Sequence, residues 1–138
     1  MTTAAITTNP TETTATTRRD RIAQVILGLC AVGAGFATAT AIGDVADAEG
    51  TARLAETWRL FGLPVFAGLF IILAVAPRRV SGLWELVIAN KIALVVAGAT
   101  FLSGVEGSSD FVYVDGILVV LLVAAYVLTR GWTAWSNR

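Results

Sequence analysis

A few ionisable and amide side chains inside long apolar runs are the residues of this sequence that could do chemistry. Glu85, Asn90 and Lys91 interrupt one apolar run, and Asp115 follows shortly after the start of another. A charge at the centre of a membrane helix costs roughly 2.5–3.5 kcal/mol, so such a residue usually faces a partner or a polar cavity. Glu85, Asn90 and Lys91 therefore form a candidate intramembrane polar site.

The helical positions of these residues limit how they can pair. Glu85 and Lys91 lie roughly 120° apart around a helix, so a tight pair between them is not expected, although Lys91 should lean towards the depth of Glu85. Arg59 and Asp115 fall at similar shallow depths and form a candidate ion pair. In one interpretation these groups only fix the register of the helices. In the other, Glu85, Asn90 and Lys91 line a pocket for a lipophilic small molecule or a transported species.

The residue types that are missing narrow the chemistry further. The sequence has no histidine, which removes the commonest metal ligand and the usual proton shuttle near neutral pH. Cys30 is the single cysteine, so an intrachain disulfide and a dithiol redox pair are both excluded. We expect Cys30 to be a small buried apolar residue. No metal site, cofactor or nucleic-acid partner is expected.

The elements that position these residues are four apolar runs. Of the 138 residues, 56% are apolar and 14% are charged, against about 45–50% and about 25% in soluble domains. A spanning helix needs roughly 20 apolar residues. The sequence therefore predicts an all-α polytopic membrane protein, a bundle of four transmembrane helices. The expected spans are about 22–43, 58–77, 80–102 and 111–129.

The flanks of this four-helix domain (residues 21–132) have a different composition. Residues 1–20 are rich in threonine and predict a disordered tail, and residues 133–138 predict a short C-terminal tail. A cleaved signal peptide is the alternative for the first run, which is longer than a signal core of about 7–15 residues. Pro64 removes one helical hydrogen bond and predicts a kink in the second span.

The charges of the loops predict an orientation. Arginines dominate one side of the predicted bundle and acidic residues dominate the other, which places both termini in the cytoplasm of a cell with the chain in its plasma membrane. Trp84, Trp132 and Trp135 are expected at the inner interface. In the first external loop, Glu56 and Arg59 are three residues apart, which favours an outward extension of the second helix. A solvated acidic loop is the alternative.

Small residues predict how the helices approach one another, because apolar burial does not drive helices together in lipid. Gly35 and Ala39 continue a seam that starts at Ala31, and Ala93 lies in a second seam with Ala89 and Ala97. These seams predict close packing of the first and third spans, or contact between copies of the chain in a homo-oligomer.

In the number, length and orientation of its spans, the chain resembles the DoxX-like small bacterial membrane proteins, which are four-helix bundles with scattered polar residues. The resemblance implies the fold and carries over no functional residue. It also resembles small multidrug-resistance transporters in outline, but those carry a glutamate in their first helix, whereas residues 22–43 contain no carboxylate.

Three functions follow as hypotheses. The first is a non-enzymatic accessory subunit, scaffold or assembly component, with the bilayer, further copies or a larger membrane protein as partners. The second is a small oligomeric transporter or exporter. The third is an enzyme or binder acting on a lipophilic small molecule dissolved in the membrane.

Overall fold

The computed structural model describes residues 10–105 and 107–136, and every regular element in that part of the chain is a helix. The helices are α1 (Pro10–Asp47), α2 (Gly50–Val75), α3 (Leu83–Thr100), α4 (Ser108–Thr129) and the short 3₁₀ helix η1 (Gly131–Trp135). Each of α1 to α4 contains a stretch long and apolar enough to cross a membrane. The predicted all-α, four-helix membrane fold is therefore confirmed.

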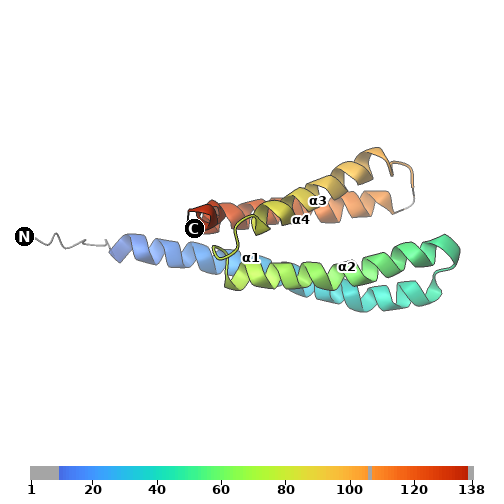
Figure 1. Cartoon of the computed structure of the whole chain (residues 1–138), viewed down its shortest axis with the longest axis horizontal. Coiled ribbons are helices and arrows are strands. Elements are labelled where there is room, and N and C mark those ends of the chain that lie inside the picture. The colour runs from blue at the N-terminus through green and yellow to red at the C-terminus, as the bar shows by residue number, and fades with distance from the viewer. Residues whose placement is uncertain (1–9, 106, 137–138) are drawn as a thin grey trace, which may run out of the picture.

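The chain forms two helical hairpins that lie side by side (Figure 1). The first pairs α1 with α2 and the second pairs α3 with α4, while α1 packs against α4 to join the hairpins. By contrast, α2 and α3 barely touch, although they follow one another in the chain. The predicted close contact of the first and third spans is not among the main packing contacts, because α1 is occupied by α2 and α4.

Glycines and prolines set the helix ends. Pro77 follows the end of α2, where its ring disfavours further helix. Gly82 and Gly107 precede α3 and α4 with φ of 85° and 81°, a conformation that side chains with a Cβ rarely adopt. Arg130 takes the left-handed conformation after α4 with φ of 51°, and this bend starts η1.

The two ends of the bundle differ in charge. The arginine-rich end carries Arg18, Arg19, Arg21, Arg78, Arg79 and Arg130, and the acidic end carries Asp44, Asp47, Glu49, Glu56 and Asp110. At the arginine-rich end, the two amino groups of the Arg78 guanidinium donate to the two carboxylate oxygens of Asp20 at 3.1 and 2.7 Å, which joins the loop after α2 to α1.

The hydrophobic core lies in the arginine-rich half of the bundle. It consists of Ala23, Leu27, Cys30, Ala31, Phe70, Leu73, Trp84, Val87, Leu122 and Ala125. Among the described residues on the acidic side of Lys91 and Asp115, the buried ones are Ala41 and Gly98. The hairpins therefore share a core on one half only, and Cys30 is a buried core residue as expected.

The helices differ in extent from the predicted spans. Residues 10–20, which the composition assigns to a disordered tail, belong to α1, because a helix nucleated in the apolar run propagates at little cost into the preceding residues. Residues 1–9 of that predicted tail lie outside the described part. The outward extension of the second helix is confirmed, since α2 begins at Gly50. α2 continues through Pro64 as one helix, and a kink there stays a prediction.

Candidate functional site

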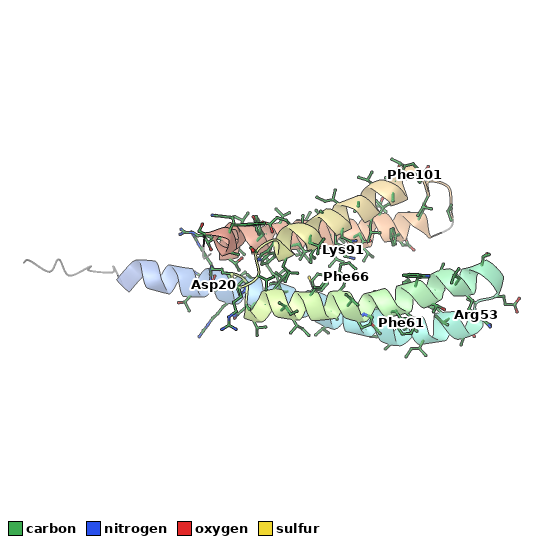
Figure 2. The ribbon with its side chains drawn as sticks, viewed as in Figure 1. Asp20, Arg53, Phe61, Phe66, Lys91 and Phe101 are labelled. Atoms are coloured by element: carbon green, nitrogen blue, oxygen red, sulfur yellow. The ribbon has the colours of Figure 1, made fainter. Side chains whose placement is uncertain are left out.

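A buried ion pair lies near the middle of the bundle. The Lys91 ammonium donates to Asp115 Oδ1 at 2.7 Å, and the two residues are only 8% and 4% exposed. The same ammonium lies 4.2 Å from the centre of the Phe66 ring, so an aromatic face of α2 covers the charge. Figure 2 shows the labelled Lys91 and Phe66 facing each other between the hairpins.

The close approach of α3 and α4 makes this pair possible. A Cβ on Gly98 would lie 2.6 Å from Val112 Cγ2, closer than real contacts allow, so only glycine permits this helix separation. Two contacts fix the register of these antiparallel helices, because Gly98 lies opposite Val112 and Glu85 contacts Tyr126. Between these two contacts, the residue of α4 at the same level as Lys91 is near Val119. Asp115 is then about one turn closer to the acidic end.

Lys91 therefore reaches away from Glu85, opposite to the lean that its helix direction predicts. The physical reason is the carboxylate of Asp115. A buried charge without a partner costs several kcal/mol, far more than the preference of a side chain for one direction along its helix. The predicted lean of Lys91 towards the depth of Glu85 is wrong.

The predicted ion pair between Arg59 and Asp115 does not form. Arg59 instead pairs with Glu56 at 2.7 Å and with Asp44, all three within the α1–α2 hairpin. Two features explain the error. α4 begins at Ser108, so Asp115 lies about 10 Å along the helix, deeper than a span starting at 111 implies. In addition, α2 turns Arg59 towards its own hairpin, where the spacing of Glu56 and Arg59 gives the expected surface pair.

The candidate polar site formed by Glu85, Asn90 and Lys91 is divided among three environments. Lys91 is buried, Asn90 is exposed on the outside of the bundle, and Glu85 is exposed at the arginine-rich end. Successive residues of a helix point 100° apart, so closeness in the sequence does not bring these side chains together.

Glu85 belongs to an aromatic cluster that the sequence did not predict. Its Oε1 accepts hydrogen bonds from the Tyr126 hydroxyl and from the Trp135 indole, each at 3.0 Å. Tyr126 also packs between Trp84 and Trp132, with ring centres 5.6 and 5.7 Å away. Residues 133–135, the start of the predicted C-terminal tail, thus belong to η1 and place the Trp135 indole on α3, while residues 137–138 of that tail lie outside the described part.

Trp84 forms the buried base of this cluster, and its predicted place at the inner interface stays a prediction. It is 1% exposed, and its indole donates to the Pro77 carbonyl at 2.8 Å. A Cβ on Gly131 would lie 2.4 Å from Tyr126 Cδ2 and 2.8 Å from the Trp84 indole nitrogen. The glycine after Arg130 therefore lets the chain pass across the two rings. The run Arg130-Gly131-Trp132 at a helix end was the one signal in the sequence for this turn.

A surface groove and a search for metal ligands add no residue to the buried ion pair or to the aromatic cluster. A shallow groove of about 330 Å³ on α4 is lined by Val112, Tyr113, Gly116, Ile117, Val120 and Leu121, with none of the candidate polar residues among them. Within residues 10–105 and 107–136, no three histidine, cysteine, aspartate or glutamate side chains gather in a way that would hold a metal ion.

No protein-family model, curated protein or solved structure matches this chain. The resemblance to DoxX-like proteins therefore stays a prediction from the outline of the spans, and the function rests on the geometry of the chain itself.

Proposed function

We propose that this protein is a non-enzymatic assembly component of a membrane, and that it associates with further copies of itself through the outer side of α3. The observation that carries the proposal is the position of Asn90. This amide lies near the middle of α3 and is exposed on the outside of the bundle.

The charged groups of the spans support a structural role for the interior. Lys91 and Asp115 neutralise each other inside the bundle, and Phe66 covers the ammonium. A residue that carries protons or binds a transported ion has to be reached by that ion. The buried pair instead fixes α3 against α4, which favours an assembly component over a transporter.

Asn90 has the opposite situation. No hydrogen bond joins its side chain to another described residue, and at this depth the surroundings outside the protein are hydrocarbon. An amide left without partners in such a medium costs several kcal/mol. A second copy is the partner that fits best, because one amide donates and accepts, so two related by a twofold axis satisfy each other.

Small residues around Asn90 allow the close approach that such a contact needs. Ala89 and Ala93 are exposed and Ala97 is half-buried, and Asn90, Ala93 and Ala97 share one face at helical spacing. Small residues let the backbones of membrane helices approach, and a polar side chain then adds an interhelical hydrogen bond. The alanine seam of α3 thus serves contact between copies rather than contact with α1.

Cysteine cross-linking in a Cys30→Ala background tests this arrangement. Asn90→Cys should form a disulfide-linked dimer in purified protein in lipid nanodiscs or bicelles under oxidising conditions. Ile92→Cys is the matched control, since Ile92 is also exposed, at nearly the same depth, but faces about 160° away. Equal cross-linking at both positions, or none at position 90, would contradict self-association through this face.

The Asn90→Ala substitution tests the role of the amide itself. Interhelical polar contacts in membranes contribute about 0.6–1.5 kcal/mol, so the dissociation constant of the dimer should rise about three- to tenfold. Fluorescence energy transfer between labelled copies measures this change. An unchanged dissociation constant would show that the alanines act without the amide.

The proposal includes a location. The arginine-rich end lies in the cytoplasm and the chain resides in the plasma membrane, as the distribution of arginines favours. A cysteine at Ser136 in intact cells should resist a membrane-impermeant maleimide, and a cysteine at Glu49 should react. The reverse labelling would overturn the orientation.

A further inference from the structure

Glu85 lies within a membrane-spanning helix, and its carboxylate has no cationic partner among the described residues. Ion pairs neutralise Asp20, Asp44, Glu56 and Asp115. The Glu85 carboxylate receives side-chain hydrogen bonds from the Tyr126 hydroxyl and the Trp135 indole, both to Oε1, and its own backbone amide also lies against it. These groups orient its negative charge, but none of them is a cation that would neutralise it.

The groups that hold this carboxylate are themselves fixed. The Tyr126 ring lies between Trp84 and Trp132, and the close approach of Gly131 leaves the ring no room to move towards that backbone. Trp84 is anchored by the Pro77 carbonyl. A ligand that binds Glu85 consequently meets a preorganised acceptor and does not have to order it, which lowers the cost of binding.

The depth of the cluster indicates what can reach it. Glu85 is in the first turn of α3, at the arginine-rich end. The exposed Trp135 donates to it, and the exposed Trp132 packs against Tyr126 in the same cluster. Tryptophan at the end of a membrane span sits at the level of the lipid headgroups. The molecules in contact with Glu85 at this level are water and lipid headgroups.

We infer that Glu85, oriented by Tyr126 and Trp135, binds the primary ammonium group of a membrane lipid headgroup. A primary ammonium has three N–H donors for the carboxylate, and a charge-assisted hydrogen bond of this kind is roughly twice as strong as a neutral one. Arg79 and Arg130 are exposed at the same end and suit the phosphate of a headgroup that carries both charges.

This inference does not depend on the proposed self-association. Glu85 and Asn90 are five residues apart and point about 140° away from each other on α3, so a dimer through Asn90 leaves Glu85 facing lipid. The alternative for Glu85 is a hydrated carboxylate that only anchors η1, and such a role predicts no preference among lipids.

Lipid selection from mixed nanodiscs tests the inference. The full chain is placed in nanodiscs of phosphatidylethanolamine, phosphatidylcholine and phosphatidylglycerol in equal amounts, and native mass spectrometry counts the lipids retained. We expect phosphatidylethanolamine to be enriched about three- to tenfold over phosphatidylcholine. Equal retention of these two lipids would overturn the inference, because phosphatidylcholine carries a quaternary ammonium without N–H donors.

Two substitutions assign the preference to the carboxylate. Glu85→Gln keeps the size and the acceptor oxygen but removes the charge, so the enrichment should disappear. Glu49→Gln is the matched control at the acidic end, where Glu49 is also exposed, and it should keep the full enrichment. Enrichment that persists in Glu85→Gln, or disappears equally in Glu49→Gln, would refute the assignment.

A third variant covers the case in which Glu85→Gln disturbs the fold. Trp135→Phe retains the charge and an aromatic ring but removes the indole donor to Glu85, so it should lower the enrichment without abolishing it. An unchanged enrichment in Trp135→Phe would show that orientation of the carboxylate plays no part.

A free amphiphilic amine carries the same kind of cation as the phosphatidylethanolamine headgroup and is the other possible ligand of Glu85. Dodecylammonium, which is such an amine, distinguishes the two. Added to the nanodiscs, it should displace phosphatidylethanolamine only when in molar excess over that lipid. Displacement at substoichiometric dodecylammonium would overturn the lipid assignment in favour of an amine ligand.

Discussion

Two ion pairs of nearly the same length lie in different parts of this molecule. The Lys91 ammonium and the Asp115 carboxylate are 2.7 Å apart, as are the Arg59 guanidinium and the Glu56 carboxylate. The side chains of the first pair are 10% and 6% exposed, and those of the second are 45% and 32% exposed. The surroundings therefore differ far more than the contact itself.

The difference shows that burial sets the energetic role of a pair. The exposed pair competes with water and salt, and such pairs contribute about 0.2–1 kcal/mol. In the buried pair, each charge depends on the other, because removing one leaves an uncompensated charge at a cost of about 3–5 kcal/mol. Replacing both charges by apolar groups removes that cost. We therefore expect the buried pair to specify how α3 meets α4 without adding much stability.

The largest expected effect comes from breaking the buried pair on one side. Asp115→Leu should destabilise the protein by about 3–5 kcal/mol, since it leaves the buried Lys91 ammonium without a counter-charge. Combining it with Lys91→Met should recover most of that loss. Thermal unfolding in detergent measures both variants. A double variant as unstable as the single one would mean that packing, not the stranded charge, is responsible.

A smaller effect is expected from the close helix approach that supports the pair. Gly98→Ala places a methyl group 2.6 Å from Val112 Cγ2, and overpacking of this kind costs about 1–3 kcal/mol. Adding Val112→Ala should relieve the clash. Gly116→Ala on α4 is the control, because nothing lies within 4 Å of its new methyl group. Equal unfolding temperatures for Gly98→Ala and Gly116→Ala would contradict the tight α3–α4 contact.

The smallest effect is expected at the acidic end. Glu56→Gln removes the exposed pair while Arg59 keeps its contact with Asp44, and it should cost less than about 1 kcal/mol. Salt at 1 M should reduce the difference from the unsubstituted protein further, since exposed charges are screened. Urea unfolding at low and high salt measures this difference. A loss as large as that of Asp115→Leu would show that exposure does not govern the two pairs.

The Glu56–Arg59 pair also illustrates what local spacing predicts well. Two residues three apart on one helix have to lie on the same face, so the sequence was enough to predict their contact and the extension of α2 around them. Asp115 is the opposite case, because its partner depends on the register between two helices. That register is set by contacts such as Gly98 with Val112, which no single segment reveals.

The sequence by itself determined the four membrane-spanning helices, the opposite charges of the two ends and the burial of Cys30. Each of these follows from composition or periodicity along one segment, since lipid and helix geometry act on every segment separately. The tertiary structure alone decided that Lys91 pairs with Asp115, that Glu85 meets Tyr126 and Trp135, and that Asn90 faces outwards. These outcomes depend on how whole helices rotate and cross. Packing between residues that are distant in the sequence decides that arrangement.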